Sequence, residues 1–196
     1  SDVCSSDLPG PTLVADERTL QEETFYGQEK KAVPALLGTL NMVLHGVTAP
    51  HIQRRNTLEE SILGSVSPRF DVVVTNPPFG GTEGRHIQAN FPVPANATEL
   101  LFVEHIMKKL KLNDGARCGM VVPEGTLFRT GAFADVKKQL LEQFDVHTIV
   151  SLPPGTFAPY SDVKTALIFF DRPSPTEEIW YYEMPLPEGL KKFSKG

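Results

Sequence analysis

The sequence predicts an α/β fold with a doubly wound, mostly parallel sheet. Short apolar runs of strand length alternate along the chain with longer segments whose apolar residues recur at helical spacing. Such alternation builds right-handed crossover units, which bring successive strands side by side in parallel. The chain has 196 residues, of which 40% are hydrophobic. It can therefore bury one substantial core, and we expect one domain.

The first third of the chain is predicted to contain two strands and one helix. Residues 1–18 scatter Ser, Asp, Pro and Gly without periodicity, which predicts an irregular lead-in. A short strand is expected over residues 24–28 and another near Ile52. Between them, residues 31–45 are predicted to form a helix that ends before Gly46. Its broad apolar face comprises Val33, Leu36, Leu37, Leu40, Val43 and Leu44.

A valine-rich strand over residues 70–75 is followed by a long connection. Residues 80–98 are rich in Gly, Asn and Pro, and compact domains rarely use so many residues to join two elements. Such a segment is expected either to serve a function or to move. A helix follows, capped by Asn96 together with Glu99 or by Thr98 alone.

The last part of the chain continues the alternation of helices and strands. The helix that begins after residues 96–98 is expected to run to about residue 112. Residues 173–196 form a tail, in which 178–182 is expected to add an edge strand. The other predicted elements are strands over 116–122, 146–152 and 163–170 and a helix over 133–144.

Charge and cysteine content limit the classes of protein to which this chain could belong. A net charge of -5 argues against holding nucleic acid by bulk electrostatics, because neutralising phosphates requires clustered Lys and Arg. If DNA is the substrate, a partner or another segment must grip it. Cys4 and Cys118 are far apart without metal-ligand spacing, so we expect no metal site and a reduced, cytoplasmic protein. No apolar run has membrane-spanning length, so we expect no membrane partner.

Asn76-Pro77-Pro78-Phe79, directly after the strand over residues 70–75, is typical of a site that methylates an amino group. An exocyclic amine such as adenine N6 is a poor nucleophile, because its lone pair is delocalised into the ring. The Asn76 side-chain oxygen and the Pro77 carbonyl can accept the hydrogen bonds of that amine as it pyramidalises. Each proline fixes its own φ and restricts the residue before it. Phe79 offers a ring face on which a flipped base can stack.

The same tetrapeptide also fits a turn after a buried strand. Its position favours a functional interpretation, because open α/β sheets bind their ligands at the carboxyl ends of the strands.

With this motif and the alternation in place, the chain resembles the N6-adenine DNA methyltransferases, specifically the modification (M) subunit of type I restriction-modification systems. The resemblance covers residues 19–172 and implies the Rossmann-like fold of S-adenosylmethionine-dependent methyltransferases. Segments 119–125, 151–157 and 163–170 follow in the order of that family. The implied reaction transfers the methyl group of S-adenosylmethionine to N6 of a flipped adenine.

The resemblance also assigns the cofactor-binding residues. Glu29 ends the motif Phe25-Tyr26-Gly27-Gln28-Glu29, whose acidic residue binds the ribose hydroxyls of the cofactor. Asn56 and Thr57 match a third motif, in which an Asp or Asn side chain meets the cofactor adenine. Two other roles stay open: Glu29 as a helix-start carboxylate near the positive end of the dipole, and Asn56 as a turn residue.

Further substrate contacts are implied near the end of the matched region. An aromatic residue from the last motif helps to sandwich the flipped adenine, and here it would be Phe169 or Phe170. Strand alternation sends only one of these two rings to any given face, and either ring could instead belong to the core. Lys164 is a candidate contact for a DNA phosphate, with solvated charge as its alternative role.

The chain departs from the family pattern at its beginning. Family members begin this fold with a strand and a glycine-rich turn, whereas the only glycine before Thr24 is Gly10. A close approach of backbone to cofactor needs glycine. We therefore expect the first strand to be missing and the isolated chain to be inactive. Our hypothesis for residues 1–8 is an artefact of gene assembly.

The implied partners are DNA, a specificity (S) subunit and a restriction (R) subunit of a type I complex. Two alternatives stay open at this point. Asn-Pro-Pro-aromatic sites also methylate glutamine side chains in proteins and exocyclic amines in RNA. The chain could also be a catalytically dead fragment or a binding module.

Overall fold

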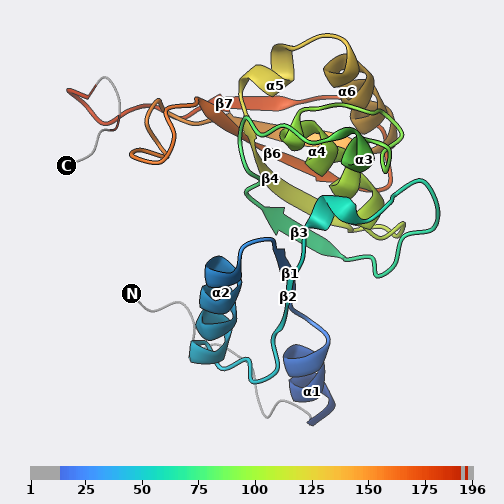
Figure 1. Cartoon of the computed structure of the whole chain (residues 1–196). Helices are drawn as coiled ribbons and strands as arrows, with labels where there is room; N and C mark the ends of the chain where they lie inside the picture. Colours follow the sequence, from blue (N-terminus) through green and yellow to red (C-terminus); the bar gives the residue numbers. More distant parts are fainter. Residues whose placement is uncertain (1–13, 191–192, 194–196) are drawn as a thin grey trace. The chain divides into compact units, whose positions relative to one another are not determined.

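The computed structural model describes residues 14–190 and residue 193 (Figure 1). The chain divides into two compact units, residues 1–60 and residues 61–196. From the composition we expected one domain, and the domain bounds stay a prediction. Among the residues whose burial is described, almost all buried hydrophobic side chains belong to the second unit, and only Ala35, Val47 and Leu58 belong to the first. Composition gives the total apolar content, but it does not tell how that content is distributed along the chain.

The described part of the first unit contains a two-stranded parallel sheet and two α-helices. Strand β1 (Tyr26–Glu29) pairs with β2 (His51–Arg54), and α2 (Ala32–Leu44) connects them and packs against both. A 3₁₀ helix, η1 (Thr57–Glu59), follows β2. The two strands and the connecting helix form one parallel crossover unit, which is the arrangement that the alternation predicts.

Helix α1 (Val14–Glu22) corrects the predicted irregular lead-in over residues 14–18. The helix contains neither Gly nor Pro, carries Asp16 and Glu17 in its first turn, and has an Arg18–Glu22 ion pair of 2.9 Å. It lacks a strong apolar periodicity, which is why a pattern search misses it. Residues 1–13, including Cys4 and the segment 1–8, lie outside the described residues.

Helix α2 forms where it is expected, but its predicted apolar face is not buried. Ala35 is the buried residue of this helix. A two-stranded sheet offers too little surface to cover a helix of this length. The exposed side chains are those of Val33, Leu36, Leu37, Leu40, Val43 and Leu44.

The second unit is built on a five-stranded sheet with the order β3-β4-β6-β5-β7. The β3–β4 and β5–β7 pairs are parallel, whereas β6 is antiparallel to both of its neighbours. Counting β1–β2, three of the five strand pairs are parallel. The predicted α/β class with a mostly parallel sheet is confirmed. The strands are β3 (Val72–Thr75), β4 (Arg117–Pro123), β5 (Asp145–Ser151), β6 (Thr165–Asp171) and β7 (Trp180–Glu183).

The antiparallel direction of β6 follows from the connection that precedes it. Residues 152–164 contain turns but no helix, and a parallel neighbour would require a crossover connection. Strand β7 lies at the sheet edge beside β5, and this observation agrees with the edge strand expected in the tail.

The core of the second unit lies against one face of this sheet. Helix α4 (Thr98–Lys109) packs on β4 and against α6 (Ala132–Gln143), while α6 packs on β5. The short helix α5 (Gly125–Phe128) lies between β4 and α6 in sequence. Alternate residues of the central strands are buried, as the period of two requires. They are Cys118, Met120 and Val122 of β4 and Ala166, Ile168 and Phe170 of β6.

The long connection over residues 80–98 is packed against the second unit. It contains the short helix α3 (Arg85–Gln88), and the side chains of Ile87 and Phe91 are each only 2% exposed. The backbone of Asn90 accepts a hydrogen bond from Ile62 over 3.0 Å. The position of this connection beside the tetrapeptide is therefore fixed by core contacts.

No helix among the described residues is long and apolar enough to cross a membrane.

Candidate active site

The tetrapeptide Asn76–Phe79 begins where β3 ends. Strand β3 lies at the edge of the sheet opposite to β7 and pairs in parallel with β4, with Thr75 opposite Met120. Asn76 is exposed directly after the strand, whereas Pro77 is buried. The neighbouring strand thus fixes the start of the motif, and the two prolines restrict the backbone that follows.

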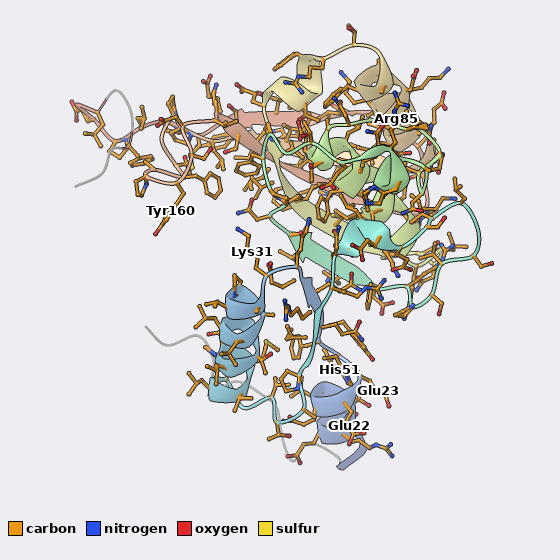
Figure 2. All side chains as sticks on the ribbon, viewed as in Figure 1. Glu22, Glu23, Lys31, His51, Arg85 and Tyr160 are labelled. Carbon is orange, nitrogen blue, oxygen red and sulfur yellow. The ribbon has the colours of Figure 1, made fainter. Side chains whose placement is uncertain are left out.

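An open cleft of about 420 Å³ lies over this motif. Its lining consists of the four motif residues together with Phe157, Tyr160 and Ser161. The rings of Phe79 and Phe157 meet edge to face, with centroids 5.5 Å apart and planes at 75°. Tyr160 is 94% exposed and its side chain extends into solvent (Figure 2). The cleft combines an exposed carboxamide with three aromatic rings, a combination that suits a planar, amine-bearing ligand.

Phe157, Tyr160 and Ser161 are the cleft residues that the sequence did not single out. They belong to the connection between β5 and β6, which contains a tight turn. The backbone N–H groups of Tyr160 and Ser161 both donate to the Phe157 carbonyl, over 2.9 and 3.0 Å. A usable signal was present, because two aromatic residues follow the carboxyl end of a predicted strand.

The predicted cofactor residues Glu29, Asn56 and Thr57 come together at one end of the first unit. Glu29 is the last residue of β1 and lies opposite Arg54, the last residue of β2. The backbone N–H of Arg55 donates to the Glu29 carbonyl over 3.0 Å. Because the strands are parallel, their carboxyl ends meet, and Asn56 and Thr57 follow directly.

Both polar side chains at this end also have structural partners. Glu29 Oε1 accepts a hydrogen bond of 2.8 Å from the Lys31 backbone N–H at the start of α2. Asn56 Oδ1 accepts one of 3.3 Å from the backbone N–H of Leu58 and so caps η1. The structural roles left open by the sequence are therefore present. A carboxylate has further acceptor sites, so the Lys31 bond leaves Glu29 able to accept from a ligand.

Phe170 is not available as a substrate contact in this structure. Its side chain is fully buried and meets Phe144 edge to face, with centroids 5.3 Å apart. Phe169 lies on the opposite face of the sheet, where its ring sits over Gly119. It is half-buried and is not among the residues that line the cleft over Asn76. Of the two rings expected to contact the flipped adenine, Phe170 is therefore a core residue.

Lys164 has two carboxylate partners. Its Nζ lies 3.1 Å from Glu124 Oε1 and 3.9 Å from Glu183 Oε1. The hydrogen bond with Glu124 raises the pKa of Lys164 above its ordinary value. Glu124 also accepts from the buried Ser151 hydroxyl over 2.9 Å. The charge of Lys164 is thus balanced locally by two carboxylates, which is the alternative role that the sequence left open, and its contact with a DNA phosphate stays a prediction.

Metal ligands are not gathered in the described part of the chain. Among residues 14–190 and 193, no three His, Cys, Asp or Glu side chains are placed so that they could hold a metal ion. Cys118 is a buried free cysteine in β4.

Comparison with known proteins gives one consistent family. A family model described as N-6 DNA Methylase matches residues 11–195. The methylase subunit of the type I restriction enzyme EcoEI from Escherichia coli is 46% identical over 183 residues, covering 92% of this chain and 36% of that protein. This chain therefore spans about a third of the length of that relative.

Two solved structures are similar to this chain over most of its length. One comes from work on complex assembly and conformational transition of a type I restriction-modification system. It is 77% identical, has a TM-score of 0.90, and is matched over 94% of this chain and 38% of its own. The other is a modification subunit of a putative type I restriction enzyme from Vibrio vulnificus. It is 45% identical, with a TM-score of 0.88 and coverage of 94% and 40%.

Proposed function

The chain belongs to the N-6 DNA methylase family, and on this premise we propose that it carries the catalytic centre of a site-specific DNA adenine-N6 methyltransferase. The supporting observation is the cleft over Asn76–Phe79 at the carboxyl end of β3. The related methylase subunit belongs to a type I restriction enzyme, so we assign this chain to the modification subunit of a type I system.

The residues of the cleft have complementary roles toward a flipped adenine. Asn76 Oδ1 and the Pro77 carbonyl accept the two hydrogen bonds of the N6 amine and favour its pyramidal form. Acceptors that are already in place stabilise the positive charge that grows on N6 during transfer. Phe79 stacks on the base, and its edge contact with Phe157 holds the ring in one orientation. Tyr160 forms the outer wall of the cleft.

The first unit supplies part of the proposed site for S-adenosylmethionine. This cofactor supplies a methyl group on a sulfonium centre. Glu29 accepts from the ribose hydroxyls at the carboxyl end of β1. Asn56 and Thr57 contact the adenine end of the cofactor. Gly27 in β1 lies close to Ile52 of β2, since a Cβ there would lie 2.7 Å from Ile52 Cδ1 and the Ile52 side chain would have to shift. The close packing of β1 on β2 thus supports the geometry around Glu29.

Partners are needed because this chain has little positive charge with which to hold DNA. Its net charge is -5, and Lys164 is already paired. We therefore propose that a specificity subunit grips and selects the DNA target and that a restriction subunit completes the complex. We propose that such a complex acts in the cytoplasm.

Sequencing of methylated DNA from cells tests this function. The complete gene would be expressed together with its neighbouring subunit genes in a bacterial host that lacks adenine methylases. Single-molecule sequencing is expected to find N6-methyladenine at one recurring sequence. Unmethylated adenine in cells that contain all the subunits, at normal protein levels, would contradict the proposal.

A further inference from the structure

Two short backbone segments pair with each other immediately after the Asn76–Phe79 motif. Thr82 and Ala97 form an antiparallel bridge. The Glu83 backbone N–H donates to the Asn96 carbonyl over 2.8 Å, and the Thr98 N–H donates to the Gly81 carbonyl over 3.0 Å. The base of the connection over residues 80–98 is therefore tied together by two backbone hydrogen bonds, and these two bonds make up the Thr82–Ala97 bridge. We call these residues, 81–83 and 96–98, the clasp.

One side of the clasp is anchored in the core of the second unit. Thr98 is the first residue of α4 and is only 3% exposed. Its hydroxyl donates to Glu83 Oε1 over 3.2 Å. Leu100 and Leu101, which follow in the first turn of α4, are almost fully buried. Because α4 is embedded in the core, Thr98 provides a fixed point against which the other side of the clasp is held.

Gly81 lies too close to Thr98 to carry a side chain. A Cβ built at Gly81 would lie 2.5 Å from Thr98 Oγ1 and 3.1 Å from Thr98 Cβ. Its φ is outside the left-handed region, so contact with Thr98, and not backbone conformation, explains the glycine. The clasp thus holds the backbone of Gly81 directly against a buried side chain.

The motif is held at both of its ends in the sequence, by β3 before it and by the clasp after it. Thr75 is held in β3 by β4 on one side, and Gly81 is held by Thr98 on the other. Only five residues separate these two anchors, and two of them are prolines, Pro77 and Pro78. A displacement of Gly81 must therefore be absorbed by the segment that contains Asn76 and Phe79.

We propose that Gly81 and Thr98 are positioning residues that fix the direction of the Asn76 carboxamide and the Phe79 ring. This inference rests on the proposed methyltransferase function for its catalytic consequence, but the positional claim can be tested without catalysis. Displacing reacting groups by about 1 Å can cost about 100-fold in rate. We therefore expect the clasp to affect turnover far more than cofactor affinity.

The experiment compares four variants in the complete protein: Gly81→Ala, Thr98→Ala, the double variant, and Gly64→Ala as the matched control. Gly64 has open space around its Cβ position and lies outside the left-handed region. The first readout is the NMR signal of the Asn76 side-chain amide. We expect it to shift in Gly81→Ala, to return toward the Thr98→Ala position in the double variant, and to stay unchanged in Gly64→Ala.

The second readout is the rate of methyl transfer, together with calorimetric binding of S-adenosylmethionine. We expect kcat to fall about tenfold or more in Gly81→Ala with nearly unchanged cofactor affinity. The double variant should recover toward the rate of Thr98→Ala, because Thr98 Oγ1, the atom nearest to the new methyl group, is gone. An Asn76 signal and kcat that are the same in Gly81→Ala and Gly64→Ala would overturn the inference.

The inference can still be tested if Gly81→Ala does not fold or if the wild-type protein does not methylate adenine. If Gly81→Ala does not fold, Thr98→Ala decides, because it loosens the clasp without adding an atom. A lowered kcat and a shifted Asn76 signal in that variant support the inference, and wild-type values overturn it. If the wild-type protein methylates no adenine, the proposed function fails, while the NMR comparison still decides whether the clasp positions Asn76.

Discussion

The ring of Phe79 meets the ring of Phe157 edge to face, although 77 residues lie between them in the sequence. This contact joins the motif after β3 to the connection after β5. Aromatic pairs of this geometry contribute about 0.5–1.5 kcal/mol beyond the area that they bury. Phe157 is therefore placed to hold the Phe79 ring in the orientation needed for stacking.

Substitution of Phe157 tests this contact. Phe157→Ala is expected to raise the KM for DNA and lower kcat by about tenfold, because an unsupported Phe79 ring stacks less well on the base. Phe157→Tyr should keep most of the activity, since it preserves the ring edge. Steady-state methylation kinetics provide the measurement. Equal loss in both variants would argue against an edge contact as the cause.

Glu29 is expected to bind cofactor and also to support the start of α2. Glu29→Gln keeps an oxygen that can accept from the Lys31 N–H but replaces the other oxygen by an amide donor. We therefore expect weaker S-adenosylmethionine binding, by about 1.5–3 kcal/mol for a charge-assisted hydrogen bond, with little change in helix content. Calorimetry and circular dichroism measure the two effects. Wild-type cofactor affinity would contradict the assignment of Glu29.

Phe169 and Phe170 should differ in their contribution to stability. Phe170→Ala removes a fully buried ring and is expected to cost about 3–5 kcal/mol. Phe169→Ala should cost clearly less, because that ring is only half-buried. Urea unfolding can be followed by the fluorescence of Trp180, the single tryptophan of the chain, which lies in β7. Equal losses in the two variants would contradict the assigned faces.

Glu104 should make stability depend on pH. It is only 3% exposed, and its Oε1 accepts from the Val93 N–H over 3.0 Å. Its Oε2 has no hydrogen-bond partner among the residues that the structure describes. Burial raises the pKa of Glu104 to about 7, against an opposing effect of the Val93 bond. Between the ordinary value of 4.5 and about 7, the folded state holds a proton that the unfolded state has lost.

Folding is therefore expected to weaken as the pH rises through this window. Glu104→Gln retains the acceptor for Val93 and cannot ionise, so it should lose this part of the pH dependence. Urea midpoints of both proteins at several pH values between about 4 and about 8 test the prediction. Parallel pH profiles would show that Glu104 does not titrate in this range.

Much of the architecture could be predicted because local patterns determine it. Valine-rich β3 and the prolines after it identified the position of Asn76 at a strand end. The antiparallel direction of β6 and the burial of Phe170 could not be predicted, since both depend on strand pairing. Alternation indicates that Phe169 and Phe170 face opposite ways, but only the pairing of Phe170 with Cys118 tells which face is covered.

The candidate site shows the same division between local and long-range information. Glu29 and Asn56 could be singled out from motifs, while their meeting at one end of β1 and β2 needed the parallel pairing. Phe157 and Tyr160 follow the carboxyl end of a predicted strand, which is a usable signal. Their place beside the motif after β3 could not be predicted, because it depends on the turn between β5 and β6. The clasp was hidden for a similar reason, since Gly81 and Thr98 meet across a long connection.

The central claim is that Asn76 activates the N6 amine of adenine. The most direct measurement incubates DNA and methyl-labelled S-adenosylmethionine with the complete protein and its partner subunits, then separates the nucleosides of the digested DNA by mass. The account predicts label in N6-methyldeoxyadenosine. For a folded, cofactor-binding Asn76→Ala variant it predicts a loss of about 100-fold or more, comparable to removing one preorganised hydrogen-bonding group. Label on cytosine, or near-normal transfer by Asn76→Ala, would contradict it.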